Sequence, residues 1–218
     1  RNLDPLSESD QKILIAYGKK NDLWIYLQSG GPETITPIWP MSPQLNYAPE
    51  EGLTLMFEPS DFTQVNATIN QNMIQRTMAL LEVCAKDRVL DLFCGLGNFS
   101  LPLAKRVNEV VGVEGDAVLV KHAQNNAKVN QLNNATFEQA DLTKTALKDY
   151  TWAEGGFNKI LLDPPRSGAF EVLSQLADLG AERIVYVSCN PATLARDAGE
   201  LVHKHGYTLI SAGIMDMF

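Results

Sequence analysis

The chain has 218 residues and a formal net charge of −8, a size that suffices for one large α/β domain with a small appendage. The acidic balance excludes a protein that grips nucleic acid over a wide surface, so an RNA-binding role requires a local basic patch or another domain. No stretch resembles a membrane span or a secretory leader, which predicts a soluble cytoplasmic protein, and the start at Arg1 rather than methionine predicts a segment of a longer chain.

The first part of the chain is predicted to be a β-rich lead-in whose own core is too small to stand alone. Strands are expected at residues 23–28 and 53–58, on either side of a stretch rich in proline and glycine. Apolar residues with helical spacing predict a helix over residues 67–85. The expected division is therefore a partial lead-in of residues 1–61 and an α/β domain of residues 62–218.

The stretch VLDLFCGLGNFSLPL, residues 89–103, reads as a buried strand, a glycine turn and the opening of a helix. Gly95 and Gly97 let the backbone turn sharply and approach a ligand, and the free N–H groups at the helix start suit polar or anionic groups. This pattern is typical of the cofactor-binding turn of a Rossmann-type half. NAD stays possible, although Ser100 stands where the dinucleotide fingerprint has its third glycine. Asp91 at the strand end favours S-adenosylmethionine, whose ammonium group it can hold.

Acidic residues follow or end the next two predicted strands. Glu114 ends a buried strand at residues 110–114, roughly 20 residues after the first glycine, where an acid accepts the two hydroxyls of a ribose in NAD enzymes and methyltransferases alike. Asp141 follows a short strand at residues 136–139 and is expected in the crevice beyond the carboxyl ends of the strands. From position alone, Asp141 either holds an adenine amino group or caps the next helix.

The fourth and fifth predicted strands, residues 160–162 and 183–188, run into two further loops. In the first loop two prolines present Asp163 from a stiff backbone, which indicates a reaction site. Arg166 replaces the aromatic residue that follows (D/N)PP in amino-group methyltransferases, which argues against an exocyclic amine as target. The second loop delivers Cys189 beside a helix N-terminus, where the helix dipole and a nearby cation favour the thiolate. A buried free cysteine is the alternative, but the loop position favours a nucleophile.

The other two cysteines are assigned packing roles. Cys84 is expected as a small buried hydrophobe on the apolar side of its helix, and Cys94 as a residue that packs under the cofactor. With no CxxC pair, neither a disulfide framework nor a metal site is predicted. Residues 208–218 read as a sixth strand, so the sheet is expected to lack its last strand.

Five segments together resemble the RNA 5-methyluridine methyltransferases, most closely the members that act on bacterial 23S ribosomal RNA: DFTQVN, DLFCGLGNFSLPLA, VEGD, LLDPPRSG and VSCNPATLARD. The resemblance covers nearly the whole chain from about Asp61 onward, and VSCNPATLARD is highly specific. It implies a Rossmann-like sheet of the class I S-adenosylmethionine-dependent methyltransferases. Cytosine-5 RNA methyltransferases differ by a proline-cysteine in the fourth-strand motif, where this chain has Pro164 and Pro165.

The resemblance also implies roles for individual residues. Cys189 is the expected nucleophile, Phe62 is expected to stack on the target uracil, and Arg166 is expected at the substrate. The residues expected around S-adenosylmethionine are Gln64, Phe93, Asn98, Glu114, Asp141 and Asp163. Asp141 departs from the family pattern, since some relatives have an amide there.

Three parts of the family have no counterpart in this sequence: an N-terminal oligonucleotide-binding-like domain, a four-cysteine iron-sulfur site, and a PHTxHxE segment whose glutamate is the general base. The implied function is methyl transfer to C5 of a uridine in 23S ribosomal RNA, with no metal, membrane or protein partner, and this segment alone is expected to turn over poorly. The alternatives are a tRNA uridine-C5 methyltransferase and a cofactor-binding fragment without turnover. A NAD-dependent oxidoreductase is disfavoured because it has no use for DPPR facing SCNP.

Overall fold

The computed structural model describes residues 1–2, 4–142, 144 and 146–217. The chain divides into two compact units. Unit 1 contains Arg1–Asn46 and Met56–Thr63, and unit 2 contains Tyr47–Leu55 and Gln64–Phe218. Part of the predicted lead-in, the segment Tyr47–Leu55, therefore belongs to unit 2. Two short strands that pair with each other, β3 (Asn46–Tyr47) and β4 (Leu55–Met56), confirm a strand within residues 53–58.

Unit 1 contains a helix and a small antiparallel sheet. Helix α1 (Glu8–Asn21) begins after Ser7, which forms a capping box with Asp10. Strand β1 (Ile25–Gln28) pairs with β2 (Ile35–Trp39) across a turn that includes η1 (Pro32–Thr34). β1 confirms the strand predicted at residues 23–28, whereas α1 and β2 have no counterpart among the predicted elements.

Helix α1 has favourable ends and only a small buried face. Ile13 and Tyr17 are 65% and 57% exposed, and Gly18 is its buried residue. The capping box satisfies free N–H groups at the start, and Lys19 and Lys20 in the last turn interact favourably with the helix dipole. Because no apolar stripe marks this helix, hydrophobic periodicity does not reveal it.

Unit 2 is built on a five-stranded parallel sheet with the order β7-β6-β5-β8-β9. The chain enters the sheet at its centre, runs outward through β6 and β7, and returns across β5 to β8 and β9. The strands are β5 (Arg88–Leu92), β6 (Glu109–Glu114), β7 (Ala135–Gln139), β8 (Lys159–Leu162) and β9 (Arg183–Tyr186). The order reverses between β5 and β8, so ligands are expected beyond the carboxyl ends of these strands. The α/β prediction is confirmed.

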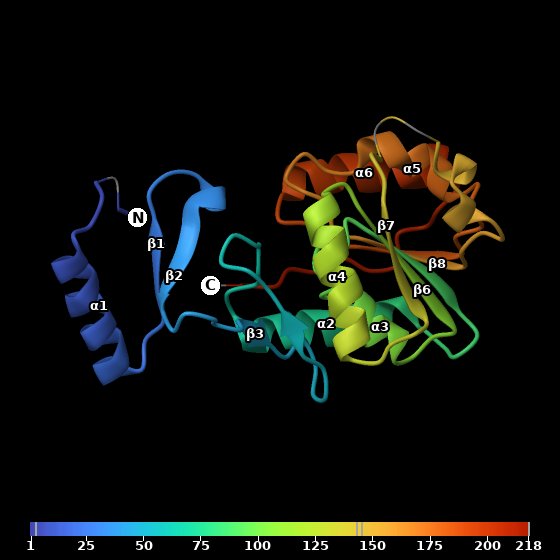
Figure 1. Cartoon of the computed structure of the whole chain (residues 1–218). Coiled ribbons are helices and arrows are strands. Elements are labelled where there is room, and N and C mark those ends of the chain that lie inside the picture. Colours follow the sequence, from blue (N-terminus) through green and yellow to red (C-terminus); the bar gives the residue numbers. More distant parts are fainter. Residues whose placement is uncertain (3, 143, 145, 218) are drawn as a thin grey trace. The chain divides into compact units, whose positions relative to one another are not determined.

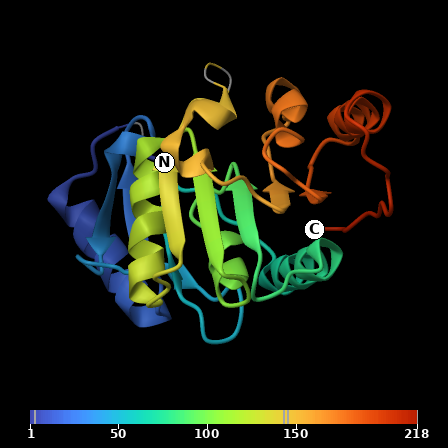
Figure 2. The same cartoon turned by 90° about the vertical axis from the view of Figure 1, so that its right-hand side faces the viewer.

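Helices cover both faces of this sheet. Figure 1 shows α5 (Phe170–Leu176) and α6 (Pro191–Lys204) on one side, and α2 (Ala67–Leu81) and α3 (Ser100–Ala104) on the other. Helix α4 (Ala117–Val129) lies beside β7 at the outer edge (Figure 2), and the 3₁₀ turns η2 (Leu147–Asp149) and η3 (Thr151–Ala153) precede β8. Asp116 caps α4 as its position at the strand end predicts, because its side chain accepts the N–H of Val118 at 2.7 Å.

Side chains on the two faces of the sheet belong to two separate hydrophobic cores. Residues that alternate along each strand pack against opposite helix layers, as the twofold period of a strand requires. Val89, Val110 and Leu161 pack with α2 and α3, whereas Leu90 and Ile160 pack with α5. Both faces are therefore apolar, which explains why the central strands read as continuous hydrophobic runs.

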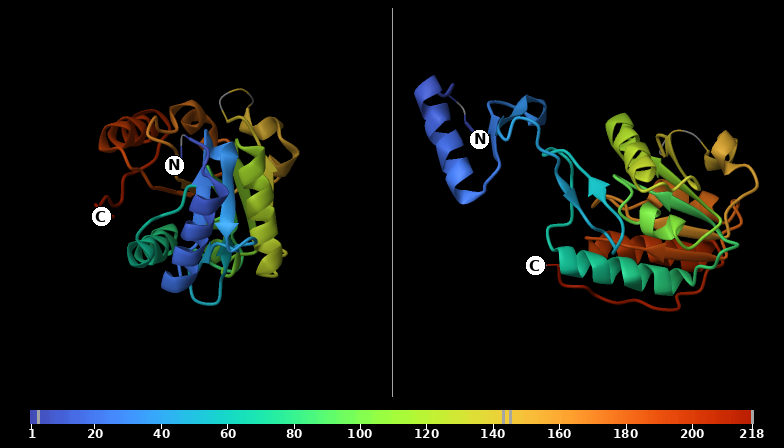
Figure 3. Two further views of the ribbon diagram at one scale, coloured as in Figure 1. Left: turned by 60° about the vertical axis from the view of Figure 1, so that its left-hand side comes forward. Right: turned by 60° about the horizontal axis from the view of Figure 1, so that its bottom comes forward.

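Two expectations about chain segments are wrong. The described residues 208–217 form no sixth strand; they have no regular structure and run alongside α2 (Figure 3), while Phe218 lies outside the described residues. Helix α2 ends at Leu81, because Glu82 takes the left-handed conformation of a C-cap. Cys84 consequently lies beyond the helix and is exposed, not buried.

Candidate functional site

The glycine turn after β5 is built from three residues with positive φ. Gly95 and Gly97 have φ of +52° and +91°, conformations that glycine adopts freely. Phe93 is a non-glycine residue at +64°, a strained conformation that is common at functional sites. The carbonyl of Val113 in β6 accepts the N–H groups of both Phe93 and Cys94, at 2.9 and 3.1 Å. These two hydrogen bonds hold the turn at the carboxyl end of the neighbouring strand.

Glu114 connects the end of β6 to this turn. Its Oε2 accepts the N–H of Gly95 at 3.1 Å, and its Oε1 accepts those of Gly115 and Asp116 at 2.7 and 3.2 Å. The carboxylate is therefore fixed by backbone amides at the sheet edge. An oxygen with one amide donor retains a lone pair for a ligand hydroxyl.

Two carboxyl groups lie at the switch point of the sheet, Asp91 in β5 and the half-buried Asp163 after β8. Asp91 is fully buried, and its Oδ2 accepts the hydroxyl of Ser100 at 2.5 Å. Its Oδ1 is buried without a hydrogen-bond partner among the described residues. Burial raises the pKa of Asp91 to about 7, and the charges of Asp163 and Glu114 add to the increase. Burial also raises the pKa of Asp163 to about 7. Such a pair attracts a cationic ligand group.

Asn98 lies in a hydrogen-bonded cluster of side chains. Its Oδ1 accepts from the Tyr47 hydroxyl and from the Asn70 amide, both at 2.9 Å, and its Nδ2 donates to Asn70 Oδ1 at 2.9 Å. Both acceptor lone pairs of Asn98 are thus in use, and one amide hydrogen remains. Nothing in the sequence pattern marks Asn70 and Tyr47 as its partners, because the pairing joins segments far apart in the chain.

The two cysteines at this edge of the sheet have different surroundings. Cys94 is buried in the glycine turn, and burial together with the charges of Asp91 and Glu114 raises the pKa of its thiol. It is a packing residue, as its position in the turn predicts, and a poor nucleophile. Cys189, after β9, is exposed. Of the two, only Cys189 has a thiol that a large substrate can approach.

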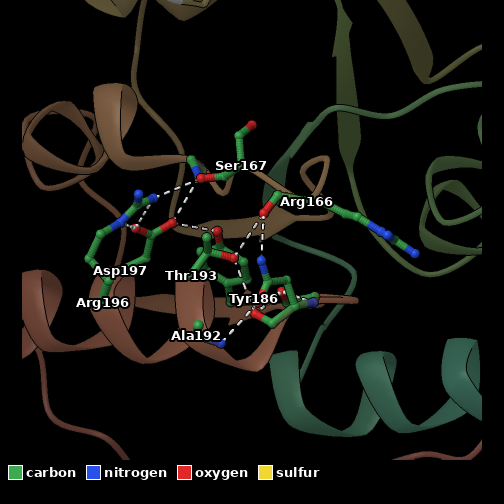
Figure 4. Close-up of polar contacts among 10 residues, drawn as sticks. Arg166, Ser167, Tyr186, Ala192, Thr193, Arg196 and Asp197 are labelled. Atoms are coloured by element: carbon green, nitrogen blue, oxygen red, sulfur yellow. Dashed lines mark hydrogen bonds and ion pairs between the residues drawn. The ribbon is translucent and has the colours of Figure 1, made fainter.

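The loop that contains DPPR is hydrogen-bonded to the segment that follows Cys189 (Figure 4). Asn190, the N-cap of α6, donates from Nδ2 to the carbonyl of Arg166 at 3.0 Å, and Thr193 donates from Oγ1 to the same carbonyl at 3.2 Å. The Arg166 side chain is exposed and points away from these contacts (Figure 4), and its guanidinium makes no hydrogen bond or ion pair with a described residue. The predicted juxtaposition of the two loops is confirmed.

The other predicted site residues are placed as follows. Phe62, in unit 1, is 80% exposed. Gln64 is half-buried. Phe93 is partly buried and packs against the hydrophobic core that includes residues of α5. Asp141, exposed after β7, forms an ion pair with Lys144 at 2.7 Å. The neighbouring Ala140 donates its N–H to the Glu114 carbonyl at 3.1 Å, which places Asp141 next to the end of β6.

Among the described residues, no group of three or more His, Cys, Asp or Glu side chains is arranged to hold a metal ion. None of the helices described is long and apolar enough to span a bilayer.

A family model described as tRNA (Uracil-5-)-methyltransferase matches residues 50–218. The chain belongs to this family. It is 54% identical over 218 residues to the 23S rRNA (uracil(1939)-C(5))-methyltransferase RlmD of Nitrosococcus oceani, and 56% identical over 220 residues to that of Alkalilimnicola ehrlichii. Each alignment covers 100% of this chain and 49% of the relative, so the chain spans about half the length of the curated relatives it matches.

A solved uracil-C5 methyltransferase has the same fold. The crystal structure of the tRNA (uracil-54, C5)-methyltransferase of Pyrococcus abyssi, in complex with S-adenosyl-L-homocysteine, superimposes with a TM-score of 0.68 at 28% identity. The match covers 80% of this chain and 40% of that one. The resemblance read from the sequence and the Rossmann-like methyltransferase fold that it implies are both confirmed.

Proposed function

We propose that the protein carrying this chain transfers a methyl group from S-adenosylmethionine to C5 of a uridine in 23S ribosomal RNA, with Cys189 as nucleophile. The observation that carries the proposal is the hydrogen-bonded junction at the carboxyl edge of the sheet, where an exposed cysteine lies in the segment joined to the DPPR loop. Family membership and the 23S rRNA enzymes that match the whole chain support the reaction and the RNA class.

The carboxyl edge fits S-adenosylmethionine. The buried Oδ1 of Asp91 has no partner among the described residues, and a cationic group of this ligand would supply one and favour the ionised form of Asp91 and of the nearby Asp163. Glu114 accepts the ribose hydroxyls, and an ideal Cβ built on Gly95 meets no atom within 4 Å, which leaves room for close approach. Gln64, Phe93, Asn98 and Asp141 complete the proposed cofactor site. When bound, S-adenosylmethionine supplies an electrophilic methyl carbon on a positively charged sulfur.

Cys189 makes the uridine reactive. C5 of uracil is too weak a nucleophile to take a methyl group directly. The Cys189 thiolate therefore forms a C–S bond to C6 of a uridine flipped out of its stack, and the electron pair of the C5–C6 double bond moves toward C5 and the C4 carbonyl. After methylation, a base removes the C5 proton, the double bond re-forms and the thiolate leaves. The sequence contains no PHTxHxE segment to supply this base, so this segment alone turns over poorly.

Two exposed residues are proposed to contact the RNA. Phe62 stacks on the target uracil, a role for which its 80% exposure makes it accessible. Arg166 binds the RNA backbone or the uracil through its unpaired guanidinium. The acidic charge of the chain supports a main RNA-binding surface in another part of the complete protein.

A tRNA uridine is the second candidate substrate. It is favoured by the description of the family model and by the tRNA enzyme of known structure. Methylation of a 23S ribosomal RNA fragment and of a tRNA transcript by the complete protein, each with tritiated S-adenosylmethionine, distinguishes the two. Incorporation into tRNA alone overturns the ribosomal assignment.

Covalent trapping tests the nucleophile. In 5-fluorouridine the fluorine replaces the proton that must leave, so the Cys189 adduct accumulates and shows as a shifted band on a denaturing gel. The complete protein is expected to form the adduct with 5-fluorouridine RNA and S-adenosylmethionine, and Cys189→Ala is expected to form none. Cys84→Ala, which removes the other exposed cysteine, is the matched control and should trap like the wild type. An adduct that persists in Cys189→Ala overturns the assignment.

A further inference from the structure

A second set of contacts joins the DPPR loop to α6, beyond the two hydrogen bonds to the Arg166 carbonyl. Its centre is Asp197, whose side chain is fully buried although it lies on the second turn of a surface helix. Asp197 Oδ2 accepts the backbone N–H of Ala169 at 2.8 Å and the hydroxyl of Tyr186 at 2.6 Å. One carboxylate oxygen thus connects α6, the end of the DPPR loop and the last residue of β9.

The other oxygen of Asp197 completes the connection through its neighbour. Arg196 Nε and Nη2 each lie 2.7 Å from Asp197 Oδ1, and Nη2 also donates to the carbonyl of Ser167 at 2.9 Å. Figure 4 shows Arg196, Asp197 and Tyr186 on one side of the loop and the Arg166 side chain directed the other way. The loop is therefore hydrogen-bonded to α6 and its N-cap at three residues, Arg166, Ser167 and Ala169.

The carboxylate is held in its charged form by these donors. Burial opposes ionisation, but the hydrogen bonds from Arg196, Tyr186 and the Ala169 amide outweigh it and lower the pKa of Asp197. The fit is tight, because an ideal Cβ on Gly168 would lie 2.5 Å from Asp197 Oδ2. A substitution of such a buried, paired carboxylate removes several hydrogen bonds at once and leaves their donors without an acceptor.

We propose that Asp197 is a positioning residue, which fixes the DPPR loop to the helix that follows Cys189 so that Arg166 and the Cys189 thiol keep one relative arrangement. Thr193 assists through its hydrogen bond to the Arg166 carbonyl. This inference rests on the proposed function. Its consequence is that the two loops act on the uridine as one body, because small displacements of reacting groups reduce rates by about 100-fold.

The test compares variants of the complete protein. Asp197→Asn keeps the shape but removes the charge, and Thr193→Val keeps the volume but removes the hydroxyl; Thr193→Ser, which retains the hydroxyl, is the matched control. The rate of adduct formation with 5-fluorouridine RNA is measured at saturating RNA, together with the RNA concentration at half-saturation and the dissociation constant of S-adenosylhomocysteine. Hydrogen exchange of the backbone amides at residues 163–169 is followed by mass spectrometry.

For Asp197→Asn we expect the saturating rate of trapping to fall by about 10- to 100-fold, with half-saturation and S-adenosylhomocysteine affinity within about threefold of wild type. Exchange at residues 163–169 should rise at least about 10-fold while that of β5 and β6 stays unchanged. Thr193→Val should slow trapping by about fivefold, as the loss of one hydrogen bond predicts, and Thr193→Ser should restore it.

The outcomes separate the two proposals. If the wild type forms no adduct, or Cys189→Ala still does, the proposed function is wrong. If the wild type traps RNA and Asp197→Asn traps at the same rate, the positioning role alone is wrong. The positioning role is also overturned if Asp197→Asn loses S-adenosylhomocysteine affinity and trapping in parallel, with exchange increased throughout the sheet, because the residue then serves only the fold.

Discussion

The Glu114 carboxylate accepts the backbone N–H of Gly95 at 3.1 Å, which couples the end of β6 to the glycine turn of the neighbouring strand. The two residues are 19 positions apart in the chain, and the parallel pairing of β5 with β6 brings them to one edge. The proposed ribose-binding acid and the glycine turn are therefore joined by a hydrogen bond within the protein itself. Three backbone amides orient the carboxylate, so its side chain loses little conformational entropy when a ligand binds.

Glu114→Gln is expected to weaken binding of S-adenosylhomocysteine by at least about 10-fold. The amide loses the charge-assisted hydrogen bonds, each worth about 1.5–3 kcal/mol, and presents a second N–H group to backbone amides. Isothermal titration calorimetry measures the effect. Glu182→Gln, an exposed acid just before β9 at the opposite edge of the sheet, should bind as the wild type does. Equal affinity in Glu114→Gln contradicts the ribose-binding role.

Ligand-free protein is expected to lose stability as pH rises between about 4 and about 7. Asp91 in the folded state keeps its proton up to a pKa of about 7, whereas the unfolded chain releases it near 4. The native state therefore binds more protons in this window, and the free energy of unfolding falls with pH, by an amount on the order of 1–3 kcal/mol.

Urea unfolding at several pH values measures this slope. Asp91→Asn, which cannot ionise, should reduce the slope by the contribution of Asp91. The contribution of Asp163 to the slope should remain. Asp178→Asn, an exposed carboxylate, should keep the wild-type slope. A slope that Asp91→Asn leaves unchanged shows that this carboxyl is not the group that titrates.

Arg166→Ala is expected to weaken RNA binding without destabilising the protein. The guanidinium contacts no described partner, so the free energy of unfolding should stay within about 0.5 kcal/mol of wild type. If Arg166 contacts a phosphate, the slope of log affinity against log salt concentration should fall by about 1. Filter binding at several salt concentrations measures the RNA affinity and its dependence on salt, and denaturant unfolding measures the stability. Lys121→Ala on α4 is the control. An equal loss of RNA affinity in that variant means that the effect reflects only the removal of a positive charge, not a specific contact of Arg166.

Gly168→Ala is expected to be more destabilising than Gly206→Ala. Both glycines have positive φ, +85° and +75°, so both variants incur backbone strain of about 1 kcal/mol or more. At Gly168 the new methyl would also lie 2.6 Å from Arg196 Nη2, whereas at Gly206 no atom lies within 4 Å. The difference between the two in denaturant unfolding should be at least about 1 kcal/mol. An equal loss of stability in the two variants means that the side chains of Arg196 and Asp197 can move away from the new methyl group without weakening the fold.

Sequence alone determined the parts of the site that depend on short-range patterns. The turn at Gly95 and Gly97, the acid at Glu114 and the cap at Asp116 follow from a buried strand, a glycine pair and a helix start. Because parallel strands end at one edge, the strand-end position of Cys189 already predicted its juxtaposition with the DPPR loop. The motifs also identified the family, which the comparison confirmed.

Tertiary structure decided what depends on partners distant in the chain. Asp197 reads as an ordinary polar residue of an amphipathic helix, and its burial follows only from the packing of α6 against the DPPR loop. Asn98 is paired with Asn70, a contact no local pattern encodes. Residues 208–217 have strand-like composition but form no strand, because strand propensity alone does not create the pairing with a neighbouring strand that a strand requires.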